Sequence, residues 1–187
     1  MVYIILGTAA FVCYIFFDLN TVYFRTKGGR CLFWLGCLLL VPATAGIIIR
    51  QLREGAAHAL SPLWCLASLI MLGLLIYTLF FALPAAEAYS GESDIRRPVC
   101  RSGMYALCRH PGVLWLGGLY AGLFLALPGW LSAAAGIVFF ILDVVYVVIQ
   151  DSVIFPQQFS DYGDYRKTTP FLIPTAASLR RCLSHLK

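Results

Sequence analysis

Two apolar runs separated by three residues decide the fold of this 187-residue chain: residues 112–127, GVLWLGGLYAGLFLAL, and residues 131–150, LSAAAGIVFFILDVVYVVIQ. The break between them is Pro128-Gly129-Trp130, and a Pro-Gly pair is a turn signal. We expect two helices that form a hairpin, which returns the chain to the side it left. The first run is short for a full crossing, so it is either a re-entrant helix or one that begins before Gly112.

Three further runs, upstream of the hairpin, have the lengths of membrane spans. Residues 2–17, 31–49 and 62–86 contain no charged side chain, and about 20 apolar residues cross the hydrocarbon core as a helix. Sixty per cent of the chain is hydrophobic and 12% is charged, whereas soluble domains carry roughly 25% charged residues. The sequence therefore predicts an all-α fold, a polytopic membrane helical bundle of about five transmembrane helices with a C-terminal helical hairpin and a cytoplasmic amphipathic tail.

The chain is expected to form a single membrane domain over residues 1–187. The first run starts Met1-Val-Tyr-Ile-Ile and lacks the positively charged segment that begins a signal peptide, so we expect it to remain as a mature helix. The seven cysteines include no Cys-x-x-Cys pair. Neither a disulfide framework nor a metal site is therefore favoured.

The basic residues predict an orientation. With the N-terminus outside, five spans place twelve of the fourteen Lys and Arg residues on the cytoplasmic side and leave Arg50 and Arg53 outside. Positive charge gathers on the cytoplasmic side of membrane proteins, so we expect an outside N-terminus and a cytoplasmic C-terminus. The net charge of +5 reflects this bias, and nucleic-acid binding is not expected.

A polar stretch lies directly before the hairpin and reads Gly103-Met-Tyr105-Ala-Leu-Cys108-Arg109-His110-Pro111. Proline suits the first position of a helix, and the free N–H groups and the dipole of a helix N-terminus attract anions. Arg96 and Arg97 are more simply explained as part of the cytoplasmic positive charge. Arg109 and His110 abut the apolar run, and we expect them to form an anion site for a carboxylate or phosphate.

These residues resemble the signature of the integral-membrane methyltransferase family that includes isoprenylcysteine carboxyl methyltransferase and the phospholipid N-methyltransferases. That signature is Gly-x-Tyr-x-x-x-Arg-His-Pro, then a helical hairpin, then an acidic pair and an aromatic tail ending in a proline. Gln150-Asp151 stands where the family has its acidic pair. The resemblance covers about residues 98–174 and, after the hairpin, includes Phe159, Tyr162, Tyr165-Arg166-Lys167 and Pro170-Phe171-Leu172-Ile173-Pro174.

The resemblance implies a cytoplasmic pocket for S-adenosylmethionine and an acceptor that is a lipid or a small hydrophobic molecule, of the isoprenylcysteine carboxylate or phospholipid amine class. Residues 87–174 would form the cofactor-binding core, residues 1–86 the acceptor side and residues 175–187 a basic tail. Arg109 and Asp151 would act in catalysis. The cofactor-binding residues would be Tyr105, Arg109, His110, Pro111, Gln150, Asp151, Tyr162 and Tyr165.

Asp143 lies inside the last apolar run, where a carboxylate is costly and therefore a functional candidate. At 100° per residue, Tyr146 and Gln150 share its helix face. This polar stripe either lines the acceptor pocket or makes interhelical contacts. Trp115 is a further candidate for the acceptor pocket, although it also fits a membrane-belt position.

Two further alternatives stay open at this point. Phe159, Tyr162 and Tyr165 recur every three residues and would share one face of a short helix, as an interfacial anchor or as a lid over the cofactor. Glu87 would line the pocket or lie solvated at the end of a span. At the level of function, the alternatives to methyl transfer are an NADPH-dependent membrane reductase and a non-catalytic family member with a structural or interaction role.

Overall fold

The computed structural model describes residues 1–56, 60–82 and 97–185. Within these ranges the chain is helical and contains no strand, apart from one isolated bridge between Arg97 and Phe159. Four helices are long and apolar enough to cross a membrane, and a fifth apolar helix of 16 residues accompanies them. The predicted all-α polytopic membrane bundle is confirmed. Its long helices are α1 (Val2–Leu19), α2 (Cys31–Arg53), α3 (Pro62–Phe80), α6 (Pro111–Ala126) and α7 (Trp130–Ile149).

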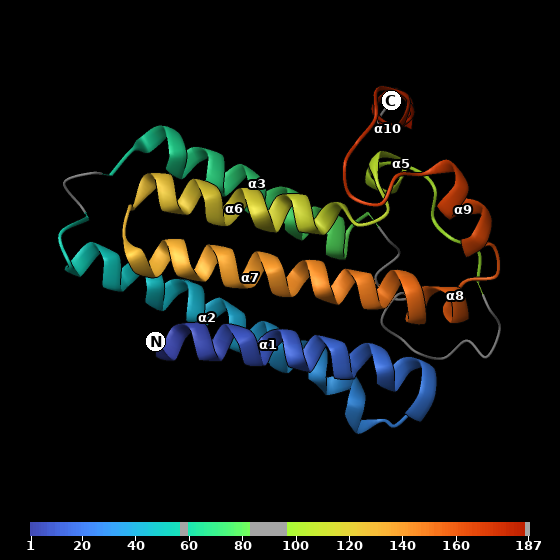
Figure 1. Ribbon diagram of the computed structural model, residues 1–187, viewed down its shortest axis with the longest axis horizontal. Coiled ribbons are helices and arrows are strands. Elements are labelled where there is room, and N and C mark those ends of the chain that lie inside the picture. The colour runs from blue at the N-terminus through green and yellow to red at the C-terminus, as the bar shows by residue number, and fades with distance from the viewer. Residues whose placement is uncertain (57–59, 83–96, 186–187) are drawn as a thin grey trace.

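The five long helices run side by side and reverse direction from each to the next (Figure 1). α1 packs against α2 and α7, while α6 packs against α3 and α7. The N-terminus lies towards one end of the bundle and the C-terminus at the other (Figure 1). The two termini therefore lie at different ends of the five-helix arrangement.

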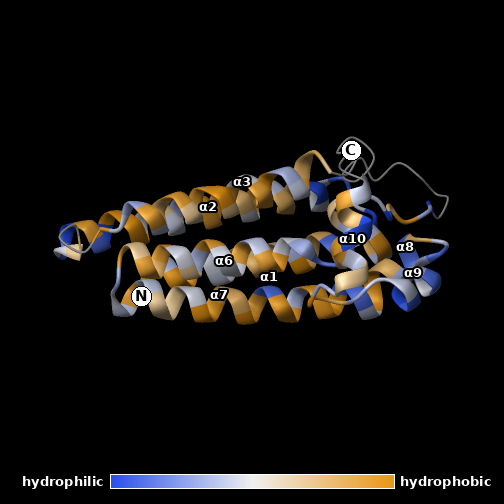
Figure 2. Ribbon diagram, turned by 90° about the horizontal axis from the view of Figure 1, so that it is seen from above, coloured by the Kyte–Doolittle hydropathy of each residue, from blue (hydrophilic) through white to orange (hydrophobic). Residues whose placement is uncertain are grey.

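Short elements gather at the end of the bundle that holds the C-terminus, which we call the tail end (Figure 1). Polar residues collect there, while the middle of the bundle is predominantly hydrophobic (Figure 2). The tail end therefore holds most of the chemistry-bearing side chains. Its short elements are η1 (Asn20–Phe24), η2 (Gly28–Arg30), α5 (Met104–Leu107), η4 (Gln150–Ile154), α8 (Phe155–Gln158), α9 (Tyr162–Thr168) and α10 (Ala176–His185).

Several helix ends differ from the sequence prediction. α1 and α2 continue past the predicted ends at residues 17 and 49, because single polar residues do not stop a helix whose other faces stay apolar. α3 ends at Phe80, before the predicted end at residue 86, because Phe81 leaves helical geometry with φ −120° and ψ −30°. Residues 83–86 lie outside the described part of the chain.

The hairpin is present, and its first helix begins at Pro111, one residue before Gly112. α6 extends along α3 and α7 to the far end of the bundle (Figure 1). At the turn, the Ser132 hydroxyl donates to the Leu127 carbonyl at 2.9 Å, and the Gln51 amide donates to Ser132 Oγ at 3.1 Å. The turn is thus tied to α2 by buried hydrogen bonds.

The core is centred on Phe139 of α7, which is fully buried. Its ring packs against Phe11 of α1 and edge-on against Tyr120 of α6, with centroids 6.1 and 5.2 Å away. The Tyr120 hydroxyl in turn lies 2.6 Å from Thr44 Oγ1 of α2. One side chain therefore fixes the spacing of α1, α6 and α7, and the hydroxyl pair adds α2.

Gly7 should be intolerant of substitution, because a methyl group at its Cβ position would overlap the Phe139 ring. We expect Gly7→Ala to destabilise the bundle by about 1–3 kcal/mol, the usual cost of overpacking, although alanine favours helices. Gly73→Ala on α3 is the matched control, since nothing lies within 4 Å of its Cβ position. Thermal unfolding in detergent measures both, and equal stability of the two variants would contradict the packing described here.

Candidate functional site

A cavity of about 270 Å³ lies between the five long helices at the tail end. Its walls are mainly apolar and come from α1, α2, α3, α6 and α7, with segments 97–110 and 155–165 closing the outer end. Basic side chains line only that outer end, where Arg97, Arg109 and His110 lie. The cavity therefore joins a positively charged mouth to an apolar interior.

The Arg-His-Pro corner is built by a tail segment that folds back on it. Arg109 N–H donates to the Pro170 carbonyl at 2.9 Å, and His110 N–H donates to the Phe171 carbonyl at 3.3 Å. Pro111 then starts α6, so its missing N–H costs no helical hydrogen bond. The backbone of residues 109–110 is thus held against the tail at the start of α6, with both side chains placed at the cavity.

Asp151 is the point at which the segments of the corner meet. Its Oδ1 accepts a hydrogen bond of 2.6 Å from the Tyr162 hydroxyl and lies 3.3 Å from both Arg109 Nε and His110 Nε2. Its Oδ2 lies 3.5 Å from Arg166 Nη2. The carboxylate side chain is 8% exposed, so these contacts are screened little by water. Asp151 ties α7, α9 and the Arg-His-Pro corner together.

Asp151 does not line the cavity. The resemblance had implied a place for it beside the cofactor. In this structure its carboxylate contacts the cavity-lining residues Arg109, His110 and Tyr162, and these three side chains lie between it and the cavity. The reason is geometric, because three of its four neighbouring donors approach the same oxygen, Oδ1, from the side of the cavity.

Arg109 differs from its neighbours in having a guanidinium group without a hydrogen-bond acceptor in the described part of the chain. Its side chain is 10% exposed, and Nε is the one buried side-chain polar atom among the described residues that lacks a hydrogen bond. The ion pair with Asp151 and the Phe171 ring, 5.4 Å from Cζ, are its contacts. Arginine keeps its charge in proteins and has five donors, so Arg109 can bind an anion at the cavity mouth.

His110 is buried between aromatic rings. The Phe155 ring stacks on it at 5.6 Å with an interplanar angle of 11°, and Phe171 approaches edge-on at 5.2 Å. Burial lowers the pKa of His110 below its ordinary value, although the hydrogen bond to Asp151 acts in the opposite direction. His110 is therefore a neutral ring at neutral pH, held in place by Asp151.

Tyr162 and Tyr165 lie on α9, and both are 2% exposed. The Tyr165 hydroxyl donates to the Tyr105 carbonyl at 2.7 Å, which joins α9 to α5. Burial and the neighbouring Asp151 carboxylate raise the pKa of Tyr162. Both tyrosines line the cavity. They contact protein on most sides and are not exposed interfacial anchors.

The three-residue spacing predicted that Phe159 shares a helix with the two tyrosines, and this prediction is wrong. Phe159 precedes α9 in extended geometry, with φ −113° and ψ 133°, because α9 begins only at Tyr162. Its ring nevertheless stacks on Tyr162 at 6.2 Å and lines the cavity beneath Arg97, whose Cζ is 5.5 Å from the ring centroid.

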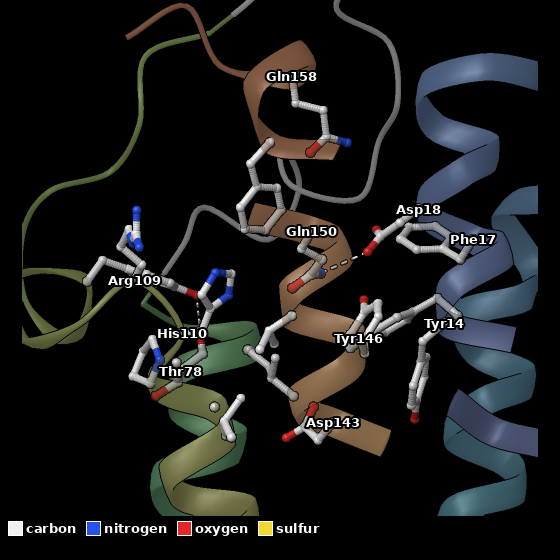
Figure 3. A pocket seen from close by; sticks show the side chains of 18 of the residues that line it. Tyr14, Phe17, Asp18, Thr78, Arg109, His110, Asp143, Tyr146, Gln150 and Gln158 are labelled. Atoms are coloured by element: carbon white, nitrogen blue, oxygen red, sulfur yellow. Dashed lines mark hydrogen bonds between the residues drawn. The ribbon is translucent and has the colours of Figure 1, made fainter. Parts of the chain in front are cut away.

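The polar stripe of α7 faces the cavity. Asp143, Tyr146 and Gln150 all line it, and Figure 3 shows them along the inner side of the helix. Trp115, the further candidate, does not line it. Its indole Nε1 instead donates to Thr78 Oγ1 at 3.0 Å, because α6 turns this face towards α3.

Asp18 is a cavity residue that sequence reasoning missed. It is 7% exposed, lines the cavity, and accepts a hydrogen bond of 2.8 Å from Gln150 Nε2 (Figure 3). It was missed because it lies one residue beyond the predicted end of the first apolar run. The available signal was that the apolar character resumes immediately at Leu19, which leaves a carboxylate inside a helix.

Some expectations fall outside the described residues, namely those for Glu87 and Arg96. Within the described ranges, no group of three or more His, Cys, Asp or Glu side chains could hold a metal ion.

Comparison with protein-family models, with curated proteins and with solved structures finds no match to this chain.

We predict that Asp151→Asn strongly destabilises the protein, by about 3–5 kcal/mol, because it leaves Arg109 as a buried charge without its partner. Tyr162→Phe alone should cost about 1.5–3 kcal/mol, as expected for a hydrogen bond to a charged group. The two losses should not add, because Tyr162 and Asp151 share that bond. Unfolding by SDS titration of mixed micelles measures the double-mutant cycle.

The control for this cycle is Asp164→Asn, which removes an exposed carboxylate paired only with Lys167 and should change stability little. Additive losses in the double variant, or a stability of Asp151→Asn equal to that of the control, would show that Asp151 does not organise the corner.

The buried neutral His110 predicts a pH dependence. Below a pH of about 6.5, its ordinary pKa, the unfolded chain binds a proton that the folded chain binds less readily. Stability should therefore decrease as the pH falls through 6.5 towards the lower pKa of the folded state. Unfolding of the wild type and His110→Gln between about pH 5 and 8 measures this effect, and the variant should show a shallower decrease. Parallel curves would refute a depressed pKa.

Proposed function

We propose that this chain transfers a methyl group from S-adenosylmethionine to a lipophilic acceptor. The observation that supports the proposal most directly is Arg109, a nearly buried guanidinium at a cavity mouth with no hydrogen-bond acceptor among the described residues. The ion pair with Asp151 compensates the charge of Arg109 but leaves its N–H donors without hydrogen bonds within the described ranges, and an anionic ligand group would supply the missing acceptors. The resemblance in residues 98–174 then indicates which ligand.

Different residues at the mouth of the cavity would bind different groups of S-adenosylmethionine. Arg109 would bind its carboxylate, since charge-assisted hydrogen bonds from arginine to carboxylates are the strong ones. The buried rings of Tyr162, Tyr165 and Phe155 line the same region and offer aromatic faces, which attract cationic groups. When bound, the cofactor supplies an electrophilic methyl group on a sulfonium. Asp151 acts indirectly, by fixing the positions of Arg109, His110 and Tyr162.

The interior of the cavity fits an apolar acceptor. Its walls below the mouth include Phe11, Leu40, Leu75, Val113 and Leu116, which carry no hydrogen-bonding groups on their side chains. Alkyl chains bind to such surfaces through the hydrophobic effect. The same walls exclude water from the reacting groups, and methyl transfer depends mainly on positioning and water exclusion.

A route for the acceptor exists at the seam between α2 and α3. Phe80 at the end of α3 stacks on Trp34 of α2 at 6.3 Å and meets Phe33 edge-on at 6.1 Å. Phe33 and Phe80 line the cavity, whereas Trp34 is 62% exposed on the outer surface of the bundle. These rings form the thin wall between the cavity and the lipid, so a lipophilic molecule would enter laterally between α2 and α3.

Binding of S-adenosylmethionine to the purified protein tests the proposal. We expect saturable binding by calorimetry in detergent, weakened by about tenfold or more in Arg109→Gln, since a hydrogen bond to a charged group is worth about 1.5–3 kcal/mol. Arg50→Gln is the matched control, because Arg50 is exposed, pairs with Glu54 and ends α2 away from the tail end.

Folded protein that does not bind S-adenosylmethionine would contradict the proposal. A parallel titration with NADPH then separates the alternatives. Binding of NADPH alone would indicate a reductase, and binding of neither would indicate a protein without catalysis.

A further inference from the structure

Asp143 is the deepest charged group of the cavity, and nothing described so far accounts for it. It lies seven residues before Gln150 on α7, which is about 10 Å further into the bundle at 1.5 Å per residue. Its side chain lines the cavity, and Figure 3 shows it turned into the space between α7 and the α3–α6 pair. Asp143 therefore lies in the apolar part of the cavity, away from the basic mouth.

The Asp143 carboxyl has no partner within the described ranges. The residue is 9% exposed, and no described side chain or backbone group forms a hydrogen bond or an ion pair with it. By contrast, Asp18 is paired with Gln150, and Asp151 has four neighbouring donors. An unpartnered carboxyl inside a membrane span is costly and indicates a ligand with a complementary group.

The charge pattern of the cavity defines that group. Among its lining residues, the helices α1, α2, α3, α6 and α7 contribute two carboxylates, Asp18 and Asp143, and no basic side chain. The polar neighbours near Asp143 are Tyr14 of α1, Tyr146 of α7 and Cys37 of α2, which bring no positive charge either. A ligand carboxylate placed here would find no positive charge to pair with among these described neighbours, whereas an ammonium group would supply both the opposite charge and the donors for a carboxylate.

We propose that Asp143 binds the amino group of the acceptor, so that the acceptor is a lipophilic amine and not a carboxylic acid. This inference rests on the proposed methyl transfer and narrows its acceptor class. The apolar walls around Asp143 hold the hydrocarbon part of the amine, and the carboxylate holds its nitrogen. Arg109 at the mouth stays available for the carboxylate of the cofactor.

The position of Asp143 also gives it a chemical role. An ammonium has no lone pair, so one proton must pass from nitrogen to the Asp143 carboxylate before the nitrogen can react. The lone pair of the amine then forms the bond to the methyl carbon as the bond from that carbon to sulfur breaks, and its electron pair stays on sulfur. The positive charge moves from sulfur to the methylated nitrogen, and the carboxyl proton leaves to solvent before the next turnover.

Binding of a simple amine, without any cofactor, tests the inference. The probe is a photoreactive decylamine in lipid nanodiscs, with decylamine and decanoate as competitors of equal chain length. We expect saturable labelling of the cavity helices that decylamine suppresses and decanoate does not. Asp143→Asn should weaken the binding at least about tenfold, as expected for loss of a buried charge partner.

Two further variants control the experiment. Asp164→Asn removes the same charge from an exposed site outside the cavity and should bind the amine like the wild type. Asp143→Glu keeps the charge and should retain more binding than Asp143→Asn. Infrared difference spectra should show a carboxyl band that changes when the amine binds to the wild type and is missing in Asp143→Asn. Should Asp143→Asn fail to fold, the preference of the wild type for decylamine over decanoate decides.

Three results would overturn the inference. Decanoate could compete better than decylamine, or Asp143→Asn could bind the amine as tightly as the wild type. Asp143→Asn could also lose affinity for S-adenosylmethionine but not for S-adenosylhomocysteine, which would place the carboxylate against the sulfonium. Because the amine experiment needs no cofactor, these failures are distinct from failure of the proposed function, which is decided by cofactor binding to the folded wild type.

Discussion

The buried carboxylate of Asp151 is the constraint on which the tail end of this bundle depends. It lies at the end of the last long helix and engages donors from the Arg-His-Pro corner and from α9. The Asp151 carboxylate is 8% exposed, and burying such a charge is costly unless partners of this kind compensate it. Each partner belongs to a short segment or to the start of α6, and the bonds from residues 109–110 to the tail and from Tyr165 to Tyr105 add to this hold. The contacts that stabilise this buried charge therefore also hold the tail and the corner in a single arrangement.

The position of the cavity follows from that arrangement. The long helices alone would leave the space between α3–α6 and α1–α2 open at the tail end, and residues 97–110 and 155–165 close it. Since the closing segments carry the basic side chains, the cavity acquires a positive mouth over an apolar interior. The hairpin turn at the opposite end needs only neutral contacts, such as those of Gln51 and Ser132. The tail end therefore relies on charged contacts, which hold short segments around a buried carboxylate, whereas the opposite end relies on neutral contacts, which hold a short turn.

The sequence was sufficient to predict the helical membrane bundle and the hairpin, while the resemblance implied that Arg109, His110, Tyr162 and Asp151 lie in one region. Long uncharged runs leave a chain few alternatives to spanning helices, and intramembrane charges must find partners. It was not sufficient to predict which polar groups those partners would be. Asp18 meets Gln150 across 132 positions of sequence, and Trp115 meets Thr78 because of the rotation of α6 against α3. Such pairings depend on helix rotation and depth, which hydropathy and spacing do not determine.

Asp143 and Arg109 together show why the two charged ends of the cavity stay separate. If they were close enough to pair, each would neutralise the other, and neither would have a reason to bind a ligand. Their segments are held apart instead, since Arg109 is bound to Asp151 and the tail backbone while Asp143 lies on the rigid α7. In the proposed function, a ligand pair that bridges this separation would carry a negative group at the mouth and a positive group inside. Such an arrangement would select for charge order along the cavity as well as for apolar surface, and apolar surface alone would admit any lipid.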